Sequence, residues 1–143
     1  MIRFVAETGS TNDDVAALAR EGAGEGLWLR AERQTGGRGR HGRAWQSPPG
    51  NLHASTLVRL RPGDPSAPTL ALVAAVALQE VVAAHARDRD IRIKWPNDLL
   101  AGGAKLAGIL LERHDAAVVI GFGVNLASHP DDTPRPATSL GVL

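Results

Sequence analysis

The longest apolar segment of the chain, residues 66–86 (SAPTLALVAAVALQEVVAAHA), sets the strongest limit on what this sequence can fold into. Its composition predicts a helix whose upper part is apolar almost all the way round. A helix without a polar face is stable in water only when most of it is covered. We therefore expect it to lie buried on a β-sheet that the rest of the chain supplies.

Five other segments have the alternation or the composition of β-strands. They are residues 27–32, 52–60, 91–95, 105–112 and 117–124. In 91–95 (IRIKW) the alternation is clean, with apolar residues on one face and Arg92 and Lys94 on the other. The last two segments predict a hairpin that turns near His114 and Asp115.

A second, shorter helix is expected after residues 10–14 (STNDD). Thr11 and Asp14 have the spacing of a capping box, and Gly22 and Gly24 are expected to end the helix. The whole pattern predicts an α+β fold, in which a mixed, largely antiparallel sheet carries both helices on one face. Basic residues and turns are expected to gather on the other side of the sheet.

Composition limits the classes of function. The 143 residues carry a net charge of only +1, with 43% hydrophobic and 22% charged residues, which is typical of one globular domain over residues 1–143. Any basic site must therefore be local. The chain lacks cysteine and its histidines have no metal-ligand spacing, so we expect no disulfide, no thiolate chemistry and no structural metal. No signal peptide or membrane-spanning segment is recognisable, which favours a cytoplasmic protein.

One local basic segment is residues 35–45 (TGGRGRHGRAW), with four glycines and three arginines. GRGRHG matches the dinucleotide-binding pattern G-x-G-x-x-G, but that pattern needs a helix directly after it, and RAWQSPPG does not predict one. A disordered RG-rich nucleic-acid tail fits poorly, because this segment is short and flanked by strands. Arginine forks on a glycine backbone suit carboxylate and phosphate groups. The residues alone leave two interpretations open, a solvated surface turn and a mobile lid over a bound anion.

Five stretches in a fixed order then point to a family. They are STN (10–12), GRGRHGRAW (37–45), KWPNDLL (94–100), KLAGIL (105–110) and GFGVN (121–125). Together they closely resemble the catalytic domain of biotin protein ligases, over essentially the whole chain. The resemblance implies a biotin/lipoate ligase-like fold and an ATP-dependent enzyme that makes biotinyl-5′-AMP from biotin. It also implies Mg²⁺ bound with ATP, and transfer of biotin to a lysine of a biotin carboxyl carrier protein.

The resemblance assigns a biotin site to residues from several parts of the chain. Ser10, Thr11 and Asn12 would bind the ureido ring of biotin, although without the resemblance they would simply cap a helix. Gln34 would be a further contact, where composition alone suggests a surface glutamine. The other biotin-binding residues that the resemblance implies are Arg38, Gly39, Arg40, Lys105 and Gly108.

The resemblance also assigns an ATP site. Its residues are Arg38, Arg40, Arg43, Trp45, Lys94, Asn97 and Asn125. Trp45 would lie on the nucleotide side, although a position in the hydrophobic core fits it nearly as well. Lys94 and Asn97 would contact phosphate or metal, whereas PND by itself is fully explained as a tight turn. Gly121 and Gly123 would allow the backbone to approach the ligand closely, or would mark a bulge and a turn.

Three catalytic residues are implied: Lys105, Arg40 and Asp98. Arg40 would bridge the biotin carboxylate and the phosphate, and Asp98 would orient or deprotonate the incoming lysine amine. Lys105 follows Lys94 by eleven residues, the spacing that the family uses. Its ammonium would then lie beside the biotin carboxylate.

For Lys105, the alternative interpretation as a solvated surface residue is stronger than for any other assigned residue. Strict alternation in AKLAGILLE puts it on the face of Ala107 and Ile109, opposite Gly108, and a lysine at the start of a strand is normally solvated. Arg59, which lies on another expected strand outside every motif, is the expected neutral comparison.

Three alternatives stay open beside the biotin ligase. A lipoate–protein ligase shares the general fold and chemistry, although the GRGRxGR loop with KWPND favours biotin. Some members of the family are also DNA-binding repressors, but STN at residue 10 leaves no room for an N-terminal helix-turn-helix, so we expect no DNA binding. Relatives usually continue past residues 134–140 (PRPATSL) into a small β-barrel domain, which this chain is expected to lack. A truncated, non-catalytic biotin-binding fragment is therefore the third alternative, and both a monomer and a homodimer are compatible with the sequence.

Overall fold

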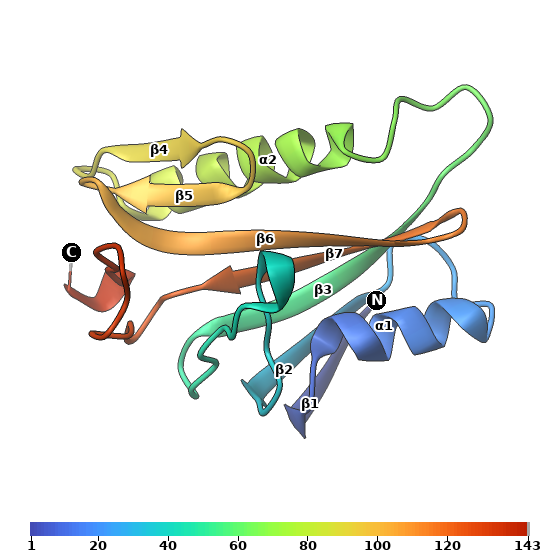
Figure 1. Ribbon diagram of the computed structural model, residues 1–143, viewed down its shortest axis with the longest axis horizontal. Coiled ribbons are helices and arrows are strands. Elements are labelled where there is room, and N and C mark those ends of the chain that lie inside the picture. The colour runs from blue at the N-terminus through green and yellow to red at the C-terminus, as the bar shows by residue number, and fades with distance from the viewer. Residues whose placement is uncertain (143) are drawn as a thin grey trace.

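The structure of the protein, a computed structural model, describes residues 1–142 and is shown in Figure 1. Its strands are β1 (Ile2–Thr8), β2 (Trp28–Gln34), β3 (Leu52–Arg59), β4 (Ile91–Lys94), β5 (Asp98–Ala101), β6 (Ala104–His114) and β7 (Ala117–Val124). Its α-helices are α1 (Thr11–Arg20) and α2 (Thr69–His85), and two short 3₁₀ helices are η1 (Arg40–Gly42) and η2 (Leu140–Val142).

The strands form one seven-stranded sheet in the order β1-β2-β3-β7-β6-β5-β4. β1 and β2 are parallel, and every other neighbouring pair is antiparallel. The expected β6–β7 hairpin is present, with Asp115 at a positive φ of 56° in its turn. The α+β class and the mixed, largely antiparallel sheet are thus confirmed.

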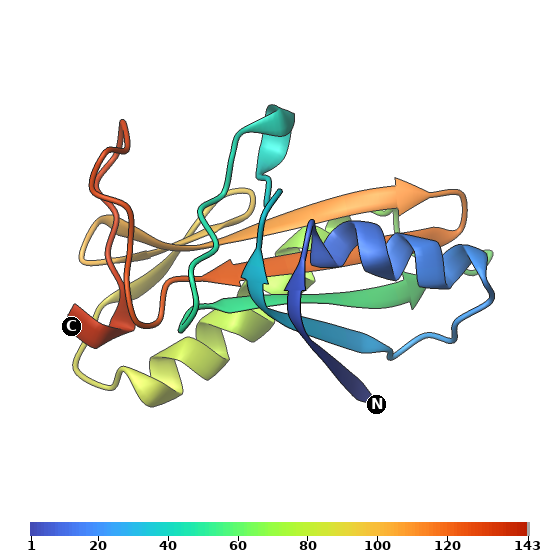
Figure 2. The same cartoon turned by 90° about the horizontal axis from the view of Figure 1, so that it is seen from below.

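The two helices lie on opposite faces of the sheet, so the prediction that both pack on one face is wrong (Figure 2). The side chains of β7 alternate between two hydrophobic clusters. Val119 packs in one cluster with Val15 of α1, while Val118 and Ile120 pack in another with Ala75 of α2. A central strand with apolar side chains on both faces is stable only when both faces are shielded from water. One helix on each face of the sheet provides this shielding.

The long helix α2 is also less buried than its composition predicts. Its small residues Ala74 and Ala75 pack against the sheet, whereas Val73 and Val81 are 58% and 57% exposed. A helix on the outside of a single sheet has only one covered side.

Two strands, β1 and β5, were not predicted from the sequence. β1 is an edge strand whose residues are exposed or half-buried on both faces, so no apolar period marks it. β5 follows the turn expected at PND and was not among the expected strands, but it pairs with β4 and β6. The chain reverses after β5 at Gly102 and Gly103, which have φ values of 56° and 84° that favour glycine.

A β-bulge in β6 decides where Lys105 points. Leu99 of β5 pairs with Ala107, but the next residue, Leu100, pairs with Lys105. The extra residue in β6 is Leu106, which is fully buried. Because the bulge shifts the alternation by one residue, Lys105 turns to the same face as Gly108, and the face that strict alternation predicted is wrong.

Candidate active site

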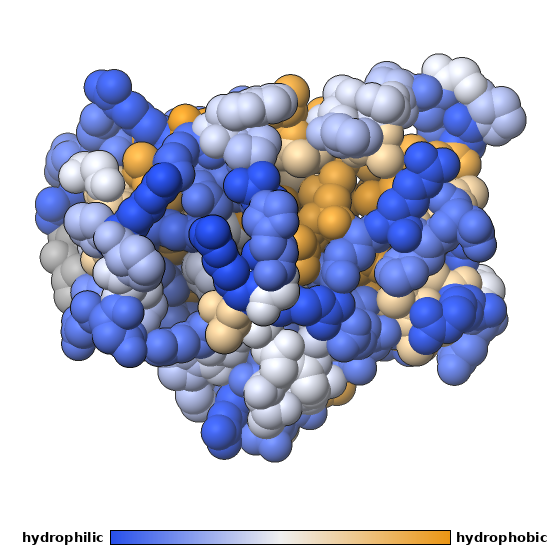
Figure 3. Space-filling model, viewed as in Figure 1, coloured by the Kyte–Doolittle hydropathy of each residue, from blue (hydrophilic) through white to orange (hydrophobic). Residues whose placement is uncertain are grey.

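A cavity of ≈ 540 Å³ lies between the loop that contains η1 and the sheet face that carries α1. All fifteen residues that the sequence assigned to a site line this cavity. They are Ser10, Thr11, Asn12, Gln34, Arg38, Gly39, Arg40, Arg43, Trp45, Lys94, Asn97, Asp98, Lys105, Gly108 and Asn125. Hydrophilic side chains cover much of this face of the molecule (Figure 3). The fold thus brings together residues that are remote in sequence.

Three glycines form the floor of the cavity on β6 and β7. Gly108 and Gly123 pair with each other, and Trp45 lies over both: a Cβ added to Gly123 would come within 2.6 Å of the indole. A Cβ added to Gly121 would overlap the carboxamide of Asn12. Gly121 and Gly123 lie inside β7 and not at a bulge or a turn, and the side chains of Asn12 and Trp45 occupy the space above them. The close approach of a ligand to these glycines stays a prediction. Trp45 is half-buried, so it both packs on the floor and borders the cavity.

The register of β6 and β7 gives the cavity a direction. Gly121 lies at one end, Gly123 beneath Trp45, and Lys105 beyond the β6 bulge at the other end. We call the Gly121 end, which is lined by Ser10, Thr11, Asn12 and Gln34, the neutral end. We call the other end, which is lined by Arg40, Arg43, Lys94, Asp98 and Lys105, the charged end.

The neutral end is built around the start of α1. Ser10 is the N-cap residue, with extended backbone, and it makes no capping hydrogen bond through its side chain. The capping box predicted for Thr11 and Asp14 is wrong, because the Asp14 carboxylate accepts instead from the Thr8 hydroxyl at 2.6 Å. The start of this helix therefore leaves its polar side chains available for other contacts.

Two of those side chains turn toward the sheet. The Ser55 hydroxyl donates to the Asn12 carboxamide oxygen at 2.6 Å and lies 2.7 Å from the Thr11 hydroxyl. The Oε1 atom of Gln34 accepts from the Thr11 backbone N–H at 2.8 Å, while its Nε2 donates to Ser47 at 3.0 Å. Gln34 is therefore a half-buried member of a hydrogen-bond cluster, where composition alone suggested a surface glutamine. A ligand at this end meets neutral donors and acceptors that are already held in place.

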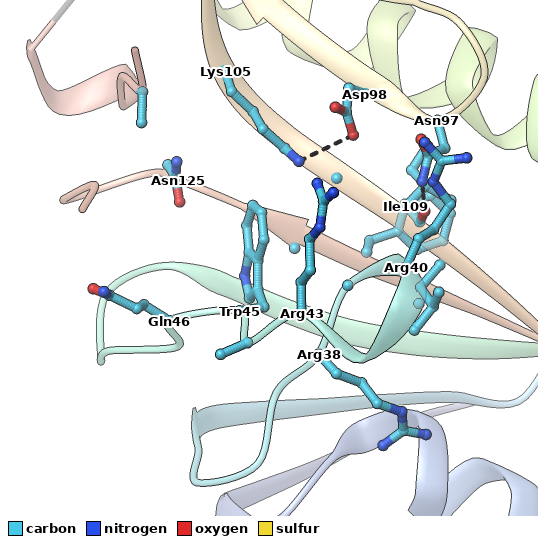
Figure 4. A pocket seen from close by; sticks show the side chains of 18 of the residues that line it. Arg38, Arg40, Arg43, Trp45, Gln46, Asn97, Asp98, Lys105, Ile109 and Asn125 are labelled. Atoms are coloured by element: carbon cyan, nitrogen blue, oxygen red, sulfur yellow. Dashed lines mark hydrogen bonds and ion pairs between the residues drawn. The ribbon is translucent and has the colours of Figure 1, made fainter. Parts of the chain in front are cut away.

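The charged end collects four cations and one anion. The Lys105 ammonium is 3.2 Å from the Asp98 carboxylate and 5.4 Å from the centre of the Trp45 ring. No ion pair is formed by Arg40, Arg43 or Lys94 within residues 1–142. In Figure 4 the Arg43 side chain extends toward Asp98 and Lys105, and the Arg40 side chain extends toward Asn97. The uncompensated positive charge here favours a polyanionic ligand.

Asn97, at the turn between β4 and β5, is oriented by its own hydrogen bond. Its Nδ2 donates to the Ile109 carbonyl at 2.6 Å, and its Oδ1 is buried without a hydrogen-bond partner. The Oδ1 atom is an acceptor, so it cannot form a hydrogen bond with a phosphate oxygen. It can bind a cation or accept from an N–H or O–H donor. Of the two partners expected for Asn97, the geometry favours metal over phosphate.

Arg38 is arranged differently from the other arginines of the loop. Its guanidinium contacts both oxygens of Asp13, at 3.1 and 2.7 Å, and both oxygens of Glu112, at 2.7 and 3.0 Å. The Arg38 contact lowers the pKa of Asp13, and both carboxylates raise the pKa of the guanidinium above its ordinary value. Arg38 thus lines the cavity, but its charge is already compensated.

One part of the cavity wall, the segment over residues 130–137, was not predicted from the sequence. Pro130, Thr133, Pro134, Arg135 and Ala137 line the cavity from this segment. Its backbone is fixed next to Lys105, whose N–H donates to Pro136 at 2.8 Å and whose carbonyl accepts from Thr138 at 2.9 Å. The segment has neither helix nor strand periodicity, so only the partial strand pairing seen in the structure reveals its position.

Asn125 has a structural contact as well as a place in the cavity wall. Its side chain is 2% exposed and donates to the Thr138 carbonyl at 3.1 Å. Asn125 therefore holds the end of β7 to the segment that follows residue 137.

The described part of the chain contains no group of three or more His, Cys, Asp or Glu side chains placed to hold a metal ion. Over the same residues, no helix has the length and apolar character needed to span a membrane.

Comparison with known proteins gives consistent results. A model of the biotin/lipoate A/B protein ligase family matches residues 8–125. A biotin–[acetyl-CoA-carboxylase] ligase of Paracoccus denitrificans is 42% identical over 134 residues, which cover 90% of this chain and 55% of that protein. The chain thus spans little more than half the length of this relative.

Two solved structures show the same architecture. Biotin protein ligase of Leishmania major, in complex with biotinyl-5-AMP, aligns with a TM-score of 0.87 at 30% identity, covering 99% of this chain and 63% of that one. Biotin protein ligase of Aquifex aeolicus, in complex with biotin and ATP, aligns with a TM-score of 0.85 at 30% identity, covering 97% and 59%. From its motifs, its cavity and the match over residues 8–125, the chain belongs to the biotin/lipoate A/B protein ligase family.

Proposed function

We propose that this chain is the catalytic domain of a biotin–protein ligase. It joins biotin to ATP to give biotinyl-5′-AMP and pyrophosphate, and then transfers biotin to a lysine of a biotin carboxyl carrier protein. The observation that carries this proposal is one cavity with a neutral, hydrogen-bonding end and a cationic end. The named relative from Paracoccus and the biotinyl-5-AMP complex of the Leishmania ligase support the same chemistry.

The neutral end suits the ureido ring of biotin. That ring is uncharged and offers two N–H donors beside a carbonyl acceptor, so it needs several neutral partners at fixed positions. Ser10, Thr11, Asn12 and Gln34 supply hydroxyl and carboxamide groups there. Because Thr11 and Gln34 are already bonded to each other, the pocket is set before biotin arrives.

The charged end suits the carboxylate of biotin and the triphosphate of ATP. In the first step a carboxylate oxygen attacks the α-phosphorus, and the bond from that phosphorus to the bridging oxygen breaks to release pyrophosphate. Lys105 and Arg40 counter the repulsion between the two anions and stabilise charge on the transferring phosphoryl group. Gly39 leaves room for the intermediate to lie close to the backbone, and Gly108 leaves room for Trp45 and Lys105 to border it.

The remaining cavity residues are assigned to the nucleotide. Arg43 and Lys94 bind phosphate charge, Trp45 forms a wall for the adenylate, and Asn125 fixes the strand end beside it. Asn97 and Asp98 would hold Mg²⁺, because the unpartnered Oδ1 and a carboxylate are the oxygen ligands that this ion prefers. The ion would neutralise phosphate charge during transfer.

In the second step the amine of the carrier lysine attacks the biotinyl carbonyl and AMP leaves. Asp98 orients this amine and takes its proton, because its carboxylate is the one anion at the charged end. The ion pair with Lys105 directs the carboxylate into the cavity. The loop over residues 37–45 covers the mixed anhydride and slows its hydrolysis.

The first test is biotin-dependent exchange of pyrophosphate into ATP, with lipoate as the competing substrate. We expect exchange with biotin and little with lipoate. Exchange that prefers lipoate would assign the cavity to a lipoate–protein ligase, and binding of biotin without exchange would identify a binding fragment.

A further inference from the structure

The loop over residues 37–45 is one compact unit rather than a random segment. The Gly39 N–H donates to Arg43 at 2.7 Å, and the Trp45 N–H donates to Gly37 at 2.9 Å, while Arg38 and Ala44 form a β-bridge. A loop that is internally bonded in this way moves largely as a whole. What fixes its position over the cavity is therefore its attachment to the sheet and to α1.

Arg38 provides the ionic attachment. It reaches Asp13 in the first turn of α1 and Glu112 on β6 with two contacts to each carboxylate. The two contacts to Asp13 come from Nη1 and Nη2 and fix the plane of the guanidinium, while both contacts to Glu112 come from Nη2. In Figure 4 Arg38 extends away from Asp98 and Lys105, opposite to Arg40 and Arg43.

Glu112 links this attachment to the neutral end. Its Oε1 accepts from Arg38 at 2.7 Å and also from the Asn12 carboxamide at 2.9 Å. The side chains of Arg38 and Glu112 are only 29% and 27% exposed, so solvent screens this pair less than a fully exposed one. One carboxylate thus holds both the loop and a residue of the neutral end.

We propose that Arg38, Asp13 and Glu112 form a clasp that positions the loop over the cavity, and that Glu112 is its central positioning residue. Arg38 then serves the loop and does not bind substrate phosphate. The positioning role is independent of the ligand, whereas its consequence for biotinyl-5′-AMP rests on the proposed function. Without the clasp the loop opens more often, and the intermediate escapes or is hydrolysed sooner.

The ligand-independent test is limited proteolysis of the free protein by trypsin, with the cleavage sites mapped by mass spectrometry. Trypsin cleaves after Arg38, Arg40 and Arg43 in the loop. Glu112→Gln and Asp13→Asn should each speed cleavage at Arg40 and Arg43 by about tenfold, which corresponds to ~1.4 kcal/mol. The matched control is Glu7→Gln, which breaks an exposed pair with Arg33 outside the cavity and should cleave like the wild type. Unchanged cleavage of the loop in both clasp variants would overturn the proposal.

If the Glu112→Gln variant does not fold, the Asp13→Asn variant still tests the proposal. The Asp13 side chain is 64% exposed on α1, so Asp13→Asn is expected to fold normally. Faster cleavage that is confined to the loop supports the clasp. Faster cleavage elsewhere in the chain, with the loop cut at the wild-type rate, contradicts it.

The second readout is the rate at which biotinyl-5′-AMP leaves the protein. Glu112→Gln should raise this rate by about tenfold, and Arg38→Gln, which breaks the contacts to both Asp13 and Glu112, by at least as much. The double variant should be no faster than Arg38→Gln alone, because Glu112 holds the loop only through Arg38. The KM for ATP should stay near the wild-type value in Arg38→Gln. A large rise in that KM would make Arg38 a phosphate ligand and contradict the clasp. If the wild type forms no adenylate, the proposed function fails, and the tryptic experiment alone decides the clasp.

Discussion

The two ends of the cavity are built in opposite ways. At the neutral end, polar side chains bond one another: Thr11 with Gln34 and Ser55, and Asn12 with Ser55 and Glu112. At the charged end, Arg40, Arg43 and Lys94 form no ion pair within residues 1–142, and the buried Oδ1 of Asn97 has no partner. These polar groups of the neutral end thus have partners within the protein, whereas several groups of the charged end have none.

The two ends therefore contribute differently to a reaction. A neutral end that is already bonded selects a ligand by shape and hydrogen-bond pattern, at little cost in ordering. Unpaired cations raise the energy of the empty protein and gain most when negative charge develops between them. We therefore expect changes at the charged end to lower the rate of adenylation, and changes at the neutral end to weaken biotin binding.

The largest effect is expected for Lys105→Ala, which removes the cation of the charged end that lies nearest Asp98. Loss of a preorganised, charge-assisted contact costs about 3–4 kcal/mol, so adenylation should fall by roughly two to three decades. The pair is partly solvated, and its contribution to stability is below about 1 kcal/mol, so the thermal midpoint should change little. Biotin-dependent pyrophosphate exchange and thermal unfolding measure the two quantities.

The control for that variant has to be chosen from the structure. Arg59 is not neutral as the sequence predicted, because its guanidinium donates to the Ala19 and Ala23 carbonyls at the end of α1. Arg92→Ala is the better control, since its side chain is 75% exposed on the edge strand β4. Equal exchange rates in Lys105→Ala and Arg92→Ala would show that Lys105 is a solvated residue without a catalytic role.

Arg40→Ala tests the same end with a smaller expected effect. Arg40 is exposed and forms no salt bridge in the described structure, so the variant should unfold at the wild-type temperature. Loss of a hydrogen bond to a charged group costs about 1.5–3 kcal/mol, so we expect adenylation to slow by roughly 10- to 150-fold and biotinyl-5′-AMP to be held less tightly. A lower unfolding temperature would show that Arg40 is structural, and normal adenylation would refute its electrostatic role.

Gly121→Ala tests the neutral end. The added methyl group would overlap the Asn12 carboxamide and displace it from Ser55. Overpacking of this kind costs about 1–3 kcal/mol, so we expect a lower free energy of unfolding and about tenfold weaker biotin binding, with ATP binding nearly unchanged. Gly24→Ala is the control, because no atom lies within 4 Å of its added Cβ. Calorimetric titration with biotin and with ATP separates the ends, and equal losses for the two ligands would contradict their independence.

The smallest effect concerns His53, which pairs with Gly123 between the two ends and is 1% exposed. Burial lowers the pKa of His53 below 6.5, although the hydrogen bond to the Pro48 carbonyl opposes this. The unfolded chain therefore takes up a proton below about pH 6.5 that the folded protein does not. The contribution of His53 to stability is complete above that pH and is lost as the pH falls below it.

Urea unfolding at pH 7.5 and pH 5.5 should thus show a larger loss of stability for the wild type than for His53→Gln. A loss of the same size in both proteins would mean that burial at this position has no effect on titration.

The sequence was most informative where chemistry is tied to short motifs. GRGRHGRAW, KWPND and KLAG each supply residues to one cavity, and all fifteen assigned residues line it. The α+β class followed from apolar periodicity, because alternation and helical spacing report burial directly. Both kinds of signal are local in sequence.

The features that the sequence did not reveal depend on contacts that are remote in sequence. The bulge at the buried residue Leu106 turns Lys105 into the cavity, and strict alternation along the sequence does not predict that shift. The apolar faces of β7 need cover from both sides, which periodicity does not assign to particular helices. Arg38 resembles its neighbours Arg40 and Arg43 in sequence, and only the position of Glu112 on β6 distinguishes it.

The intact mass of a biotin carboxyl carrier domain, after incubation with this protein, biotin, ATP and Mg²⁺, reports activation and transfer of biotin together. If one cavity activates biotin at its charged end and then transfers it, the carrier gains one biotinyl group. The gain should be nearly absent over the same time with Lys105→Ala, and absent when lipoate replaces biotin. A carrier of unchanged mass, with no biotinyl-5′-AMP in the mixture, would contradict the account, as would a lipoyl gain in place of the biotinyl one.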